Sequence, residues 1–208
     1  MSPRFKTVRR DLVSILVLCA TVFVARASLA DHYVVPSGSM EPTVVVGDHV
    51  CVNKLAYGLR VPESQLYLLP GGGPARGDVV VLNSPTDGEV LLKRVVAVPG
   101  DRVAVTDGRV ILDGLDGIPV VTREGSGDRG ESAVIEQLGA HTHALGLEFG
   151  GGPDLAGTTL PEGRYLVLGD NRGNSRDGRY FGLVARSAIL GRAEAVCIHE
   201  GRPVWHGL

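Results

Sequence analysis

From residue 31 to the C-terminus, the sequence consists of short aliphatic runs separated by turn residues, and this pattern limits the folds that the chain can adopt. None of the runs continues with the 3.6-residue period of an amphipathic helix. Valine pairs and triplets, which favour strands, recur along the chain, and 29 glycines and 12 prolines provide turns. We therefore predict a mainly β domain, built as an all-β sandwich or from coiled sheets in a barrel-like arrangement.

Seven runs have the length and composition of strands. They are residues 48–53, 78–82, 90–98, 102–105, 109–112, 165–168 and 193–199. Asp107-Gly108 is a hairpin-type dipeptide and falls between two of these runs. Residues 122–160 show the least pattern, so we expect an inserted flap within the region 110–160.

The first 30 residues differ from the rest in charge and hydropathy. Five basic residues and one acidic residue lie there, and the run 12–25 is uncharged. Extended to 11–30, the segment would form about 30 Å of helix, enough to cross a bilayer. The basic residues before it predict a cytoplasmic tail at 1–10, a transmembrane anchor at 11–30 and an extracytoplasmic domain at 31–208. The alternative is a secretory signal cleaved after Ser28-Leu29-Ala30. Either interpretation exports the rest of the chain.

Charge and cysteine content exclude some classes of function. The net charge of -2 leaves no large basic surface for nucleic acid. Cys19 lies in the N-terminal apolar run, and no CxxC or zinc-type spacing occurs. Cys51 and Cys197 are far apart in sequence and could either form a disulfide or stay free.

A first candidate for chemistry is a Ser/Gly/Pro cluster shortly after the apolar segment. Ser37 and Ser39 flank Gly38, between Pro36 and Pro42, which predicts a tight and exposed turn. A nucleophilic hydroxyl needs such a display, with backbone N–H groups free to face the reacting oxygen. Taken alone, the cluster is equally typical of an ordinary loop.

Lys93 is the second candidate, because it lies inside an apolar, strand-like run. The chain has three lysines, and only Lys54 and Lys93 follow the N-terminal segment. If Lys93 faces inward, burial favours its neutral amine, which can accept a proton from a serine. The alternative is an edge strand that presents Lys93 and Arg94 to solvent.

The third candidate is the polar segment 168–182, which contains two aspartates and three arginines. Considered alone, it could be a solvated or metal-binding loop. Its charges could instead pair internally and form a rigid floor beneath a site.

Taken together and in this order, the three segments resemble the bacterial type I signal peptidases, which are membrane-anchored serine proteases with a Ser/Lys dyad. Arg76-Gly77-Asp78-Val79-Val80 belongs to the same resemblance, which covers roughly residues 10–182 and is least clear across 110–160. Two positions depart from the family pattern. Gly173 stands where many members have an acidic residue, and Phe181 where many have tryptophan.

The resemblance implies a role for each matching residue. Ser39 would be the nucleophile and Lys93 the general base. The Ser37 hydroxyl would donate a hydrogen bond to the oxyanion, and Ser175 would orient the lysine. Asp177 and Arg179 would form a structural ion pair below the site. Asp170 and Arg172 would support it.

The resemblance also implies a substrate and a location. The family cleaves exported preproteins after small residues in an Ala-x-Ala pattern, at the outer surface of the bacterial cytoplasmic (inner) membrane and beside the export channel. No cofactor or metal is expected. Six apolar residues match the walls of the substrate pocket: Tyr33, Val35, Met40, Val44, Leu91 and Leu92. Ordinary core packing is the alternative for these, and for Val44 in particular. The extended substrate is expected to add a strand beside residues 91–93 and the domain to lie against membrane lipid.

Other functions compete with this one. Soluble, self-cleaving Ser/Lys proteins share the dyad logic but lack an apolar N-terminus. A specialised pilin or conjugation peptidase of the same superfamily would differ only in its substrates. An exported β domain that binds without catalysis finds support in His141-Thr142-His143, which could hold a metal if a third ligand were near. His49 lies close to Ser39 in sequence, but no Asp/His pattern accompanies it.

Overall fold

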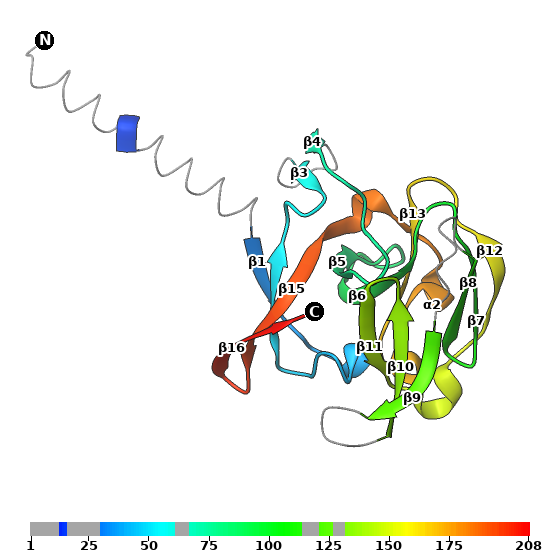
Figure 1. Cartoon of the computed structure of the whole chain (residues 1–208). Coiled ribbons are helices and arrows are strands. Elements are labelled where there is room, and N and C mark those ends of the chain that lie inside the picture. Colours follow the sequence, from blue (N-terminus) through cyan, green and yellow to red (C-terminus); the bar gives the residue numbers. More distant parts are fainter. Residues whose placement is uncertain (1–12, 16–29, 61–66, 114–120, 127–131) are drawn as a thin grey trace, which may run out of the picture.

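The computed structural model describes residues 13–15, 30–60, 67–113, 121–126 and 132–208 (Figure 1). Within these ranges, antiparallel strands make up most of the chain, which confirms the predicted mainly β class. The strands form four sheets rather than one closed barrel.

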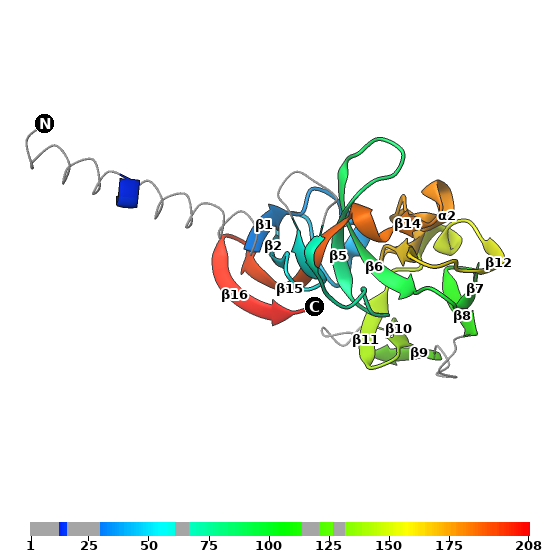
Figure 2. The same ribbon diagram turned by 90° about the horizontal axis from the view of Figure 1, so that it is seen from above.

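The largest sheet has eight strands and the order β1-β2-β15-β5-β6-β13-β14, with β16 paired to β15. Its strands are β1 (Ala30–Val34), β2 (His49–Asn53), β5 (Val79–Asn83), β6 (Val90–Ala97), β13 (Arg164–Leu168), β14 (Val184–Ala185), β15 (Ile189–His199) and β16 (Arg202–Gly207). Figures 1 and 2 show β1 and β16 at one end of this sheet.

Three smaller sheets accompany it. They contain β9 (Val121–Ser126), β10 (Ser132–Leu138) and β11 (His141–Leu145); β7 (Arg102–Thr106), β8 (Arg109–Asp113) and β12 (Leu155–Thr159); and β3 (Gly58–Arg60) with β4 (Tyr67–Pro70). In both views the first two lie at the end of the molecule away from β1 and β16 (Figures 1 and 2). Short helical turns connect the strands: η1 (Gly38–Met40), η2 (Glu148–Gly151), η3 (Arg172–Asn174), α2 (Gly178–Phe181) and η4 (Arg186–Ala188).

The main sheet is buried on both faces at its strands β5 and β6. Along β5, Val79 and Val81 pack into one hydrophobic cluster, whereas Val80 and Leu82 pack into another. Successive side chains of a strand point to opposite faces, so a continuous aliphatic run is what a strand covered on both sides requires. This explains why the run is apolar throughout instead of alternating.

All seven predicted strands are present, with boundaries shifted by a few residues. The predicted turn at Asp107-Gly108 joins β7 to β8, and both residues have positive φ, 50° and 72°. Positive φ at both positions is characteristic of the two-residue type I′ hairpin, in which Asp-Gly is favoured.

The region with little sequence pattern, 122–160, is more regular than expected. It contains most of the β9–β11 sheet, and β12 pairs with β7. The alternation is hidden because two buried positions, Glu136 on β10 and His143 on β11, are polar. A buried ionic side chain looks like an exposed one in a hydropathy pattern.

Cys51 on β2 and Cys197 on β15 form a disulfide, with their Cα atoms 5.9 Å apart. The two strands are neighbours in the main sheet, so the bond joins residues that the sheet already brings together. This decides between the two alternatives that the sequence left open.

The predicted anchor at 11–30 lies outside the described residues, apart from the helical residues 13–15 and from Ala30, where β1 begins. Nowhere in the described ranges is there a helix with the length and apolar character needed to cross a bilayer.

Candidate active site

The turn that follows β1 presents Ser39. Ser37 has extended backbone angles and leads into η1, where the Glu41 N–H donates to the Gly38 carbonyl at 3.1 Å. Met40 is 1% exposed and fixes the turn to the core, whereas Ser39 is half-buried. The main-chain carbonyl of Ser39 accepts the N–H of Asn171 at 3.2 Å. The serine is therefore held by its backbone while its hydroxyl stays accessible.

Lys93 lies on β6, opposite Val80 of β5, and is 3% exposed. Its Nζ is 2.7 Å from Ser39 Oγ, and it donates to the Leu92 carbonyl at 2.9 Å. Burial lowers the pKa of the Lys93 amine from 10.5 to about 8, although the negative charges of Asp177 and Asp170 partly oppose this shift. A substantial fraction of the amine is therefore neutral in mildly alkaline solution, and it lies within hydrogen-bonding distance of the hydroxyl.

The two other predicted serines differ in their contacts with this pair. Ser37 Oγ is 3.5 Å from Ser39 Oγ, at the long limit of a hydrogen bond. Ser175 is buried, and its Oγ has no hydrogen-bond partner among the described residues. It packs closely on Gly169, where an added Cβ would lie 2.3 Å from both Ser175 Oγ and the Ser39 carbonyl oxygen. Gly169 thus permits a contact that any side chain would prevent.

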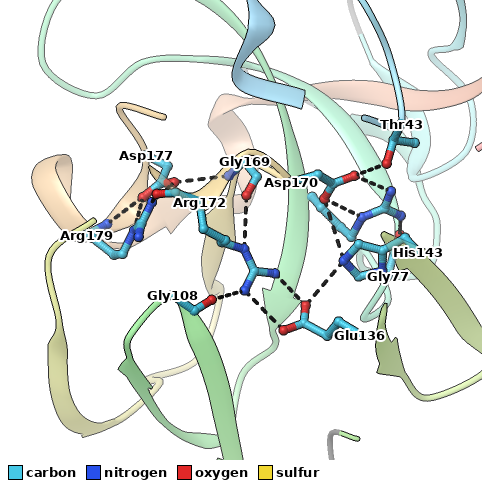
Figure 3. Close-up of polar contacts among 11 residues, drawn as sticks. Thr43, Gly77, Gly108, Glu136, His143, Gly169, Asp170, Arg172, Asp177 and Arg179 are labelled. Atoms are coloured by element: carbon cyan, nitrogen blue, oxygen red, sulfur yellow. Dashed lines mark hydrogen bonds and ion pairs between the residues drawn. The ribbon is translucent and has the colours of Figure 1, made fainter. Parts of the chain in front are cut away.

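Asp177 and Arg179 form a buried ion pair, as the resemblance implied. Arg179 Nε donates to Asp177 Oδ1 at 2.8 Å, and its Nη2 donates to Oδ2 at 2.9 Å. Asp177 also accepts the backbone N–H of Gly169 at 3.0 Å, and Arg179 donates to the carbonyls of Gly151 and Arg172. The pair ties the segment 169–179 to itself (Figure 3).

Asp170 and Arg172 do not pair with each other. Asp170 accepts two hydrogen bonds from Arg94, at 2.9 and 2.7 Å, and one from the Thr43 hydroxyl at 2.5 Å. Arg172 instead forms a fork with Glu136 (Figure 3). Arg94 is 2% exposed, so the alternative in which Lys93 and Arg94 face solvent is wrong.

Sequence reasoning did not assign Thr43, Arg94, Glu136 or His143 to this network. His143 Nε2 lies 3.2 Å from Glu136 Oε2 and 3.6 Å from Asp170 Oδ1. Burial would raise the pKa of Asp170, but the neighbouring Arg94 charge dominates and holds that pKa at about 2. Two of them gave a signal in the sequence, because Arg94 is adjacent to Lys93 and His143 belongs to the histidine pair 141/143 that suggested a metal.

The dyad opens into a cavity of about 230 Å³. Its lining residues are Ser37, Ser39, Ser84, Asp87, Glu89, Leu91, Lys93, Asn174, Arg176 and Phe181. Arg176 is paired with Asp87 at 2.9 Å, which links the β5–β6 turn to the segment after η3. The charged lining residues Asp87, Glu89 and Arg176 are exposed.

The six predicted pocket residues separate into two groups. Leu91 lines the cavity. Val35, Met40 and Val44 belong to a buried hydrophobic cluster, against which Tyr33 and Leu92 pack. Val44 is completely buried, as in the core alternative.

The His141-Thr142-His143 pattern, which suggested a metal, does not form a metal site among the described residues. His143 is buried beside Glu136, whereas its neighbour on β11, Thr142, is exposed. Across the ranges that the structure describes, no three His, Cys, Asp or Glu side chains are arranged to hold a metal ion. Asp48 Oδ1 lies 2.6 Å from His199 Nδ1 on β15, and Asp48 Oδ2 accepts the Val45 N–H at 3.0 Å.

Comparison with known proteins identifies the family of the chain. Residues 8–198 match the family described as "Signal peptidase, peptidase S26". A protein named Signal peptidase I from Pseudomonas aeruginosa is 38% identical over 191 residues, which is 84% of this chain and 67% of the relative. A Signal peptidase I from Pseudomonas fluorescens is 37% identical over 198 residues, 88% of this chain and 69% of the relative. A crystal structure of a signal peptidase I from Enterococcus faecalis matches 58% of this chain and 97% of its own, with 30% sequence identity and a TM-score of 0.37.

Proposed function

Because the chain belongs to the signal peptidase family, peptidase S26, we propose that Ser39 and Lys93 are the dyad with which it hydrolyses its substrates. The protein is a serine endopeptidase that removes the N-terminal signal peptides of exported preproteins. One observation carries the assignment of the dyad: the 2.7 Å contact between Lys93 Nζ and Ser39 Oγ, made by an amine that is buried on β6. No histidine is needed for this chemistry.

In the acylation step, Ser39 Oγ attacks the scissile carbonyl carbon while the neutral Lys93 amine takes the hydroxyl proton. The Leu92 carbonyl accepts a hydrogen bond from the amine and so fixes its direction. Negative charge develops on the carbonyl oxygen, where the Ser37 hydroxyl and the Ser39 N–H can stabilise it. Lys93 then passes its proton to the leaving amine, the C–N bond breaks, and the mature protein departs from the ester.

Deacylation uses the same base, with water as the nucleophile and Ser39 Oγ as the leaving group. Lys93 accepts a proton from water, and the resulting hydroxide oxygen attacks the ester carbonyl. When the tetrahedral intermediate collapses, the proton returns to Ser39 Oγ and the signal peptide leaves as a carboxylate. This is the logic of the serine protease triad with an amine in place of imidazole and aspartate.

The proposed binding mode for the substrate is an added strand. β13 pairs with β6 through Arg94, Val95 and Ala97, and in the described chain no strand pairs with residues 91–93 on that side. Backbone groups there are available to an extended peptide, which would pass Leu91 and reach Ser39. The specificity for Ala-x-Ala sites rests on the resemblance to the family. Small side chains would suit the shallow apolar wall.

We also propose the membrane arrangement that the sequence indicates, with residues 1–10 in the cytoplasm, 11–30 as the anchor and 31–208 outside, next to the export channel. The nucleophile follows the first residue of β1 by only nine positions, so an anchor ending there would keep the site near the outer lipid surface. Val34 and Val46, on either side of the catalytic turn, are 55% and 56% exposed, which is consistent with a domain that lies on lipid.

Replacement of each dyad residue by alanine tests the function. We expect Ser39→Ala and Lys93→Ala, in the full chain in detergent micelles, to reduce preprotein cleavage by at least about 10³-fold. Lys54→Ala is the matched control, because Lys54 is the other lysine after the N-terminal segment and lies at the surface, paired with Asp31. Wild-type cleavage by both dyad variants would reject the assignment.

The anchor has a separate test. The intact mass of the protein extracted from membranes should include residues 1–30, apart from routine removal of the first methionine. A mass that begins after Ala30 would favour the cleaved-signal alternative and would leave the dyad untouched.

A further inference from the structure

One buried ion pair near the dyad has no part in the mechanism described above. Glu136 on β10 and Arg172 on η3 have fully buried side chains. Arg172 Nη1 donates to Glu136 Oε1 at 3.1 Å, and Nη2 donates to Oε2, so that the two planar groups meet as a fork. Burial would raise the pKa of Glu136, but the Arg172 charge prevails and lowers it to about 2. Glu136 is therefore ionised wherever the enzyme is folded and active.

Stability alone does not account for this arrangement. The desolvation penalty of a buried ion pair is large, and replacement of such a pair by apolar side chains is often neutral or stabilising. The Arg172 side chain also does more than neutralise Glu136. Its Nε donates to the Gly169 carbonyl at 3.0 Å and its Nη1 to the Gly108 carbonyl at 2.5 Å. The guanidinium thus fixes the backbone of the turn that follows β13 (Figure 3).

That turn touches the nucleophile directly. The Asn171 N–H donates to the Ser39 carbonyl at 3.2 Å. Gly169 lies so close to the same carbonyl oxygen that an added Cβ would be 2.3 Å from it. A shift of the turn would therefore move the main chain that carries the Ser39 hydroxyl.

The same carboxylate also reaches the side of the site that holds the base. His143 lies between Glu136 and Asp170, 3.2 Å from the first and 3.6 Å from the second. Asp170 in turn holds Arg94, which is the neighbour of Lys93 on β6. Glu136, which belongs to the β9–β11 sheet, therefore contacts both Arg172, which supports the Ser39 backbone, and His143, which leads through Asp170 and Arg94 to Lys93.

We propose that Glu136 is a positioning residue of the peptidase, which holds Arg172 and, through Arg172, the turn 169–172 that sets the Ser39 hydroxyl against the Lys93 amine. The β9–β11 sheet is then part of the catalytic apparatus, although none of its described residues lines the cavity. This inference rests on the proposed dyad, because it concerns the geometry of that pair.

The test compares two buried ion pairs of the same chemistry in the full chain. Glu136→Gln removes the charge of the proposed positioning residue. Asp101→Asn is the matched control, because Asp101 is 1% exposed and forms a similar fork with Arg76, with the carboxylate holding the N–H of Val98. Each variant is assayed at a temperature where circular dichroism shows it to be fully folded.

We expect Glu136→Gln to lower kcat for cleavage of an Ala-x-Ala preprotein by about 10- to 100-fold, because a misplacement of reacting groups by about 1 Å has that effect. KM should stay within about twofold, and the midpoint of the pH–rate profile should not move, because the groove and the Lys93 amine keep their surroundings. Asp101→Asn should lose comparable thermal stability but keep kcat within about twofold.

The double variant Glu136→Met with Arg172→Met covers the case in which Glu136→Gln does not fold. An apolar pair of similar volume restores packing without an unpaired charge. If the pair positions the turn, this variant folds and is slow. A folded double variant, or a folded Glu136→Gln, with wild-type kcat would overturn the proposal. In that event Ser39→Ala would still be inactive, so failure of this inference is distinguishable from failure of the dyad.

Discussion

The protonation state of Lys93 depends on its burial on β6. The ammonium form loses hydration there, whereas Asp177 and Asp170 favour it, and the balance is a pKa of about 8. A base with this pKa is about one-tenth neutral at pH 7 and half neutral at pH 8. The enzyme thus has a usable base near neutral pH without a histidine.

The pH dependence of cleavage follows from that value. We expect kcat/KM to rise about tenfold per pH unit below about pH 8 and to level off above it, because only the neutral amine can accept the serine proton. The profile is measured on a preprotein between about pH 6 and about pH 10. A flat profile across this range would mean that Lys93 is not the base.

The burial that makes Lys93 a usable base also lowers the stability of the folded protein at neutral pH. The folded pKa of about 8 lies below the unfolded value of 10.5, so at pH 7 the folded state holds a buried charge. Between pH 8 and 10.5 the unfolded chain binds more protons than the folded one, and the free energy of unfolding rises with pH.

Lys93→Met removes this penalty. Relative to wild type, we expect the variant to be more stable by up to about 3 kcal/mol at about pH 7, and the difference to shrink towards zero by about pH 10.5. Urea unfolding at the two pH values measures it. An unchanged difference between the neutral and the alkaline measurement would contradict the assigned titration.

At the scale of single residues, the sequence predicted charge pairs where the two residues lie close together in the chain or where the resemblance specified them. Asp177 and Arg179 are two positions apart and are paired. Glu136 and Arg172 are separated by 36 positions, and nothing in the sequence around Glu136 distinguishes it from a surface glutamate. Long-range pairing of charges depends on the fold and could not be predicted from local pattern.

At the scale of elements, the turn between β13 and η3 does more than connect them. It places Gly169 against the nucleophile's carbonyl, directs Asp170 to Arg94 and supplies the N–H of Asn171. Since the Ser39 carbonyl is backbone, it cannot rotate away from an intruding atom.

Gly169→Ala is expected to disturb the site. Its Cβ would meet the Ser39 carbonyl oxygen and Ser175 Oγ at 2.3 Å, so the turn and η1 must separate. We expect a loss of about 1–3 kcal/mol in unfolding free energy, as for other overpacked sites, together with a fall in kcat. Gly72→Ala is the control, because a Cβ added there would have no neighbouring atom within 4 Å, and it should leave kcat unchanged. Equal activity of the two variants would refute the close contact.

Strands were the most predictable elements, because aliphatic runs bounded by turn residues report burial directly. The pocket walls were less predictable. Val35, Met40 and Val44 are aliphatic whether they face the core or a cavity, and the structure buries all three in one cluster. The β9–β11 sheet escaped prediction because its inward positions, Glu136 and His143, are polar.

At the scale of the whole molecule, the disulfide closes a large part of the chain. Cys51 and Cys197 are separated by 146 positions, which span most of the β domain. A covalent link of this kind limits the conformations of the unfolded chain.

Removal of the disulfide should therefore destabilise the domain. In a Cys19→Ala background, which leaves no other thiol, we expect Cys51→Ala with Cys197→Ala to lower the unfolding free energy by about 2–4 kcal/mol. Because neither cysteine lines the cavity, kcat below the unfolding midpoint should stay within about twofold. Chemical denaturation with and without the bond measures the first effect. Equal midpoints would show that the bond adds nothing.

The residues that hold the catalytic loop in place come later in the sequence than the catalytic residues themselves. Lys93 follows Ser39 by 54 positions, and Asp170, which holds Thr43 in the same loop as the serine, follows Thr43 by 127. A nascent or truncated copy therefore has its reactive groups long before the scaffold that aligns them. The alignment of Ser39 with Lys93 therefore depends on residues that are synthesised after both of them.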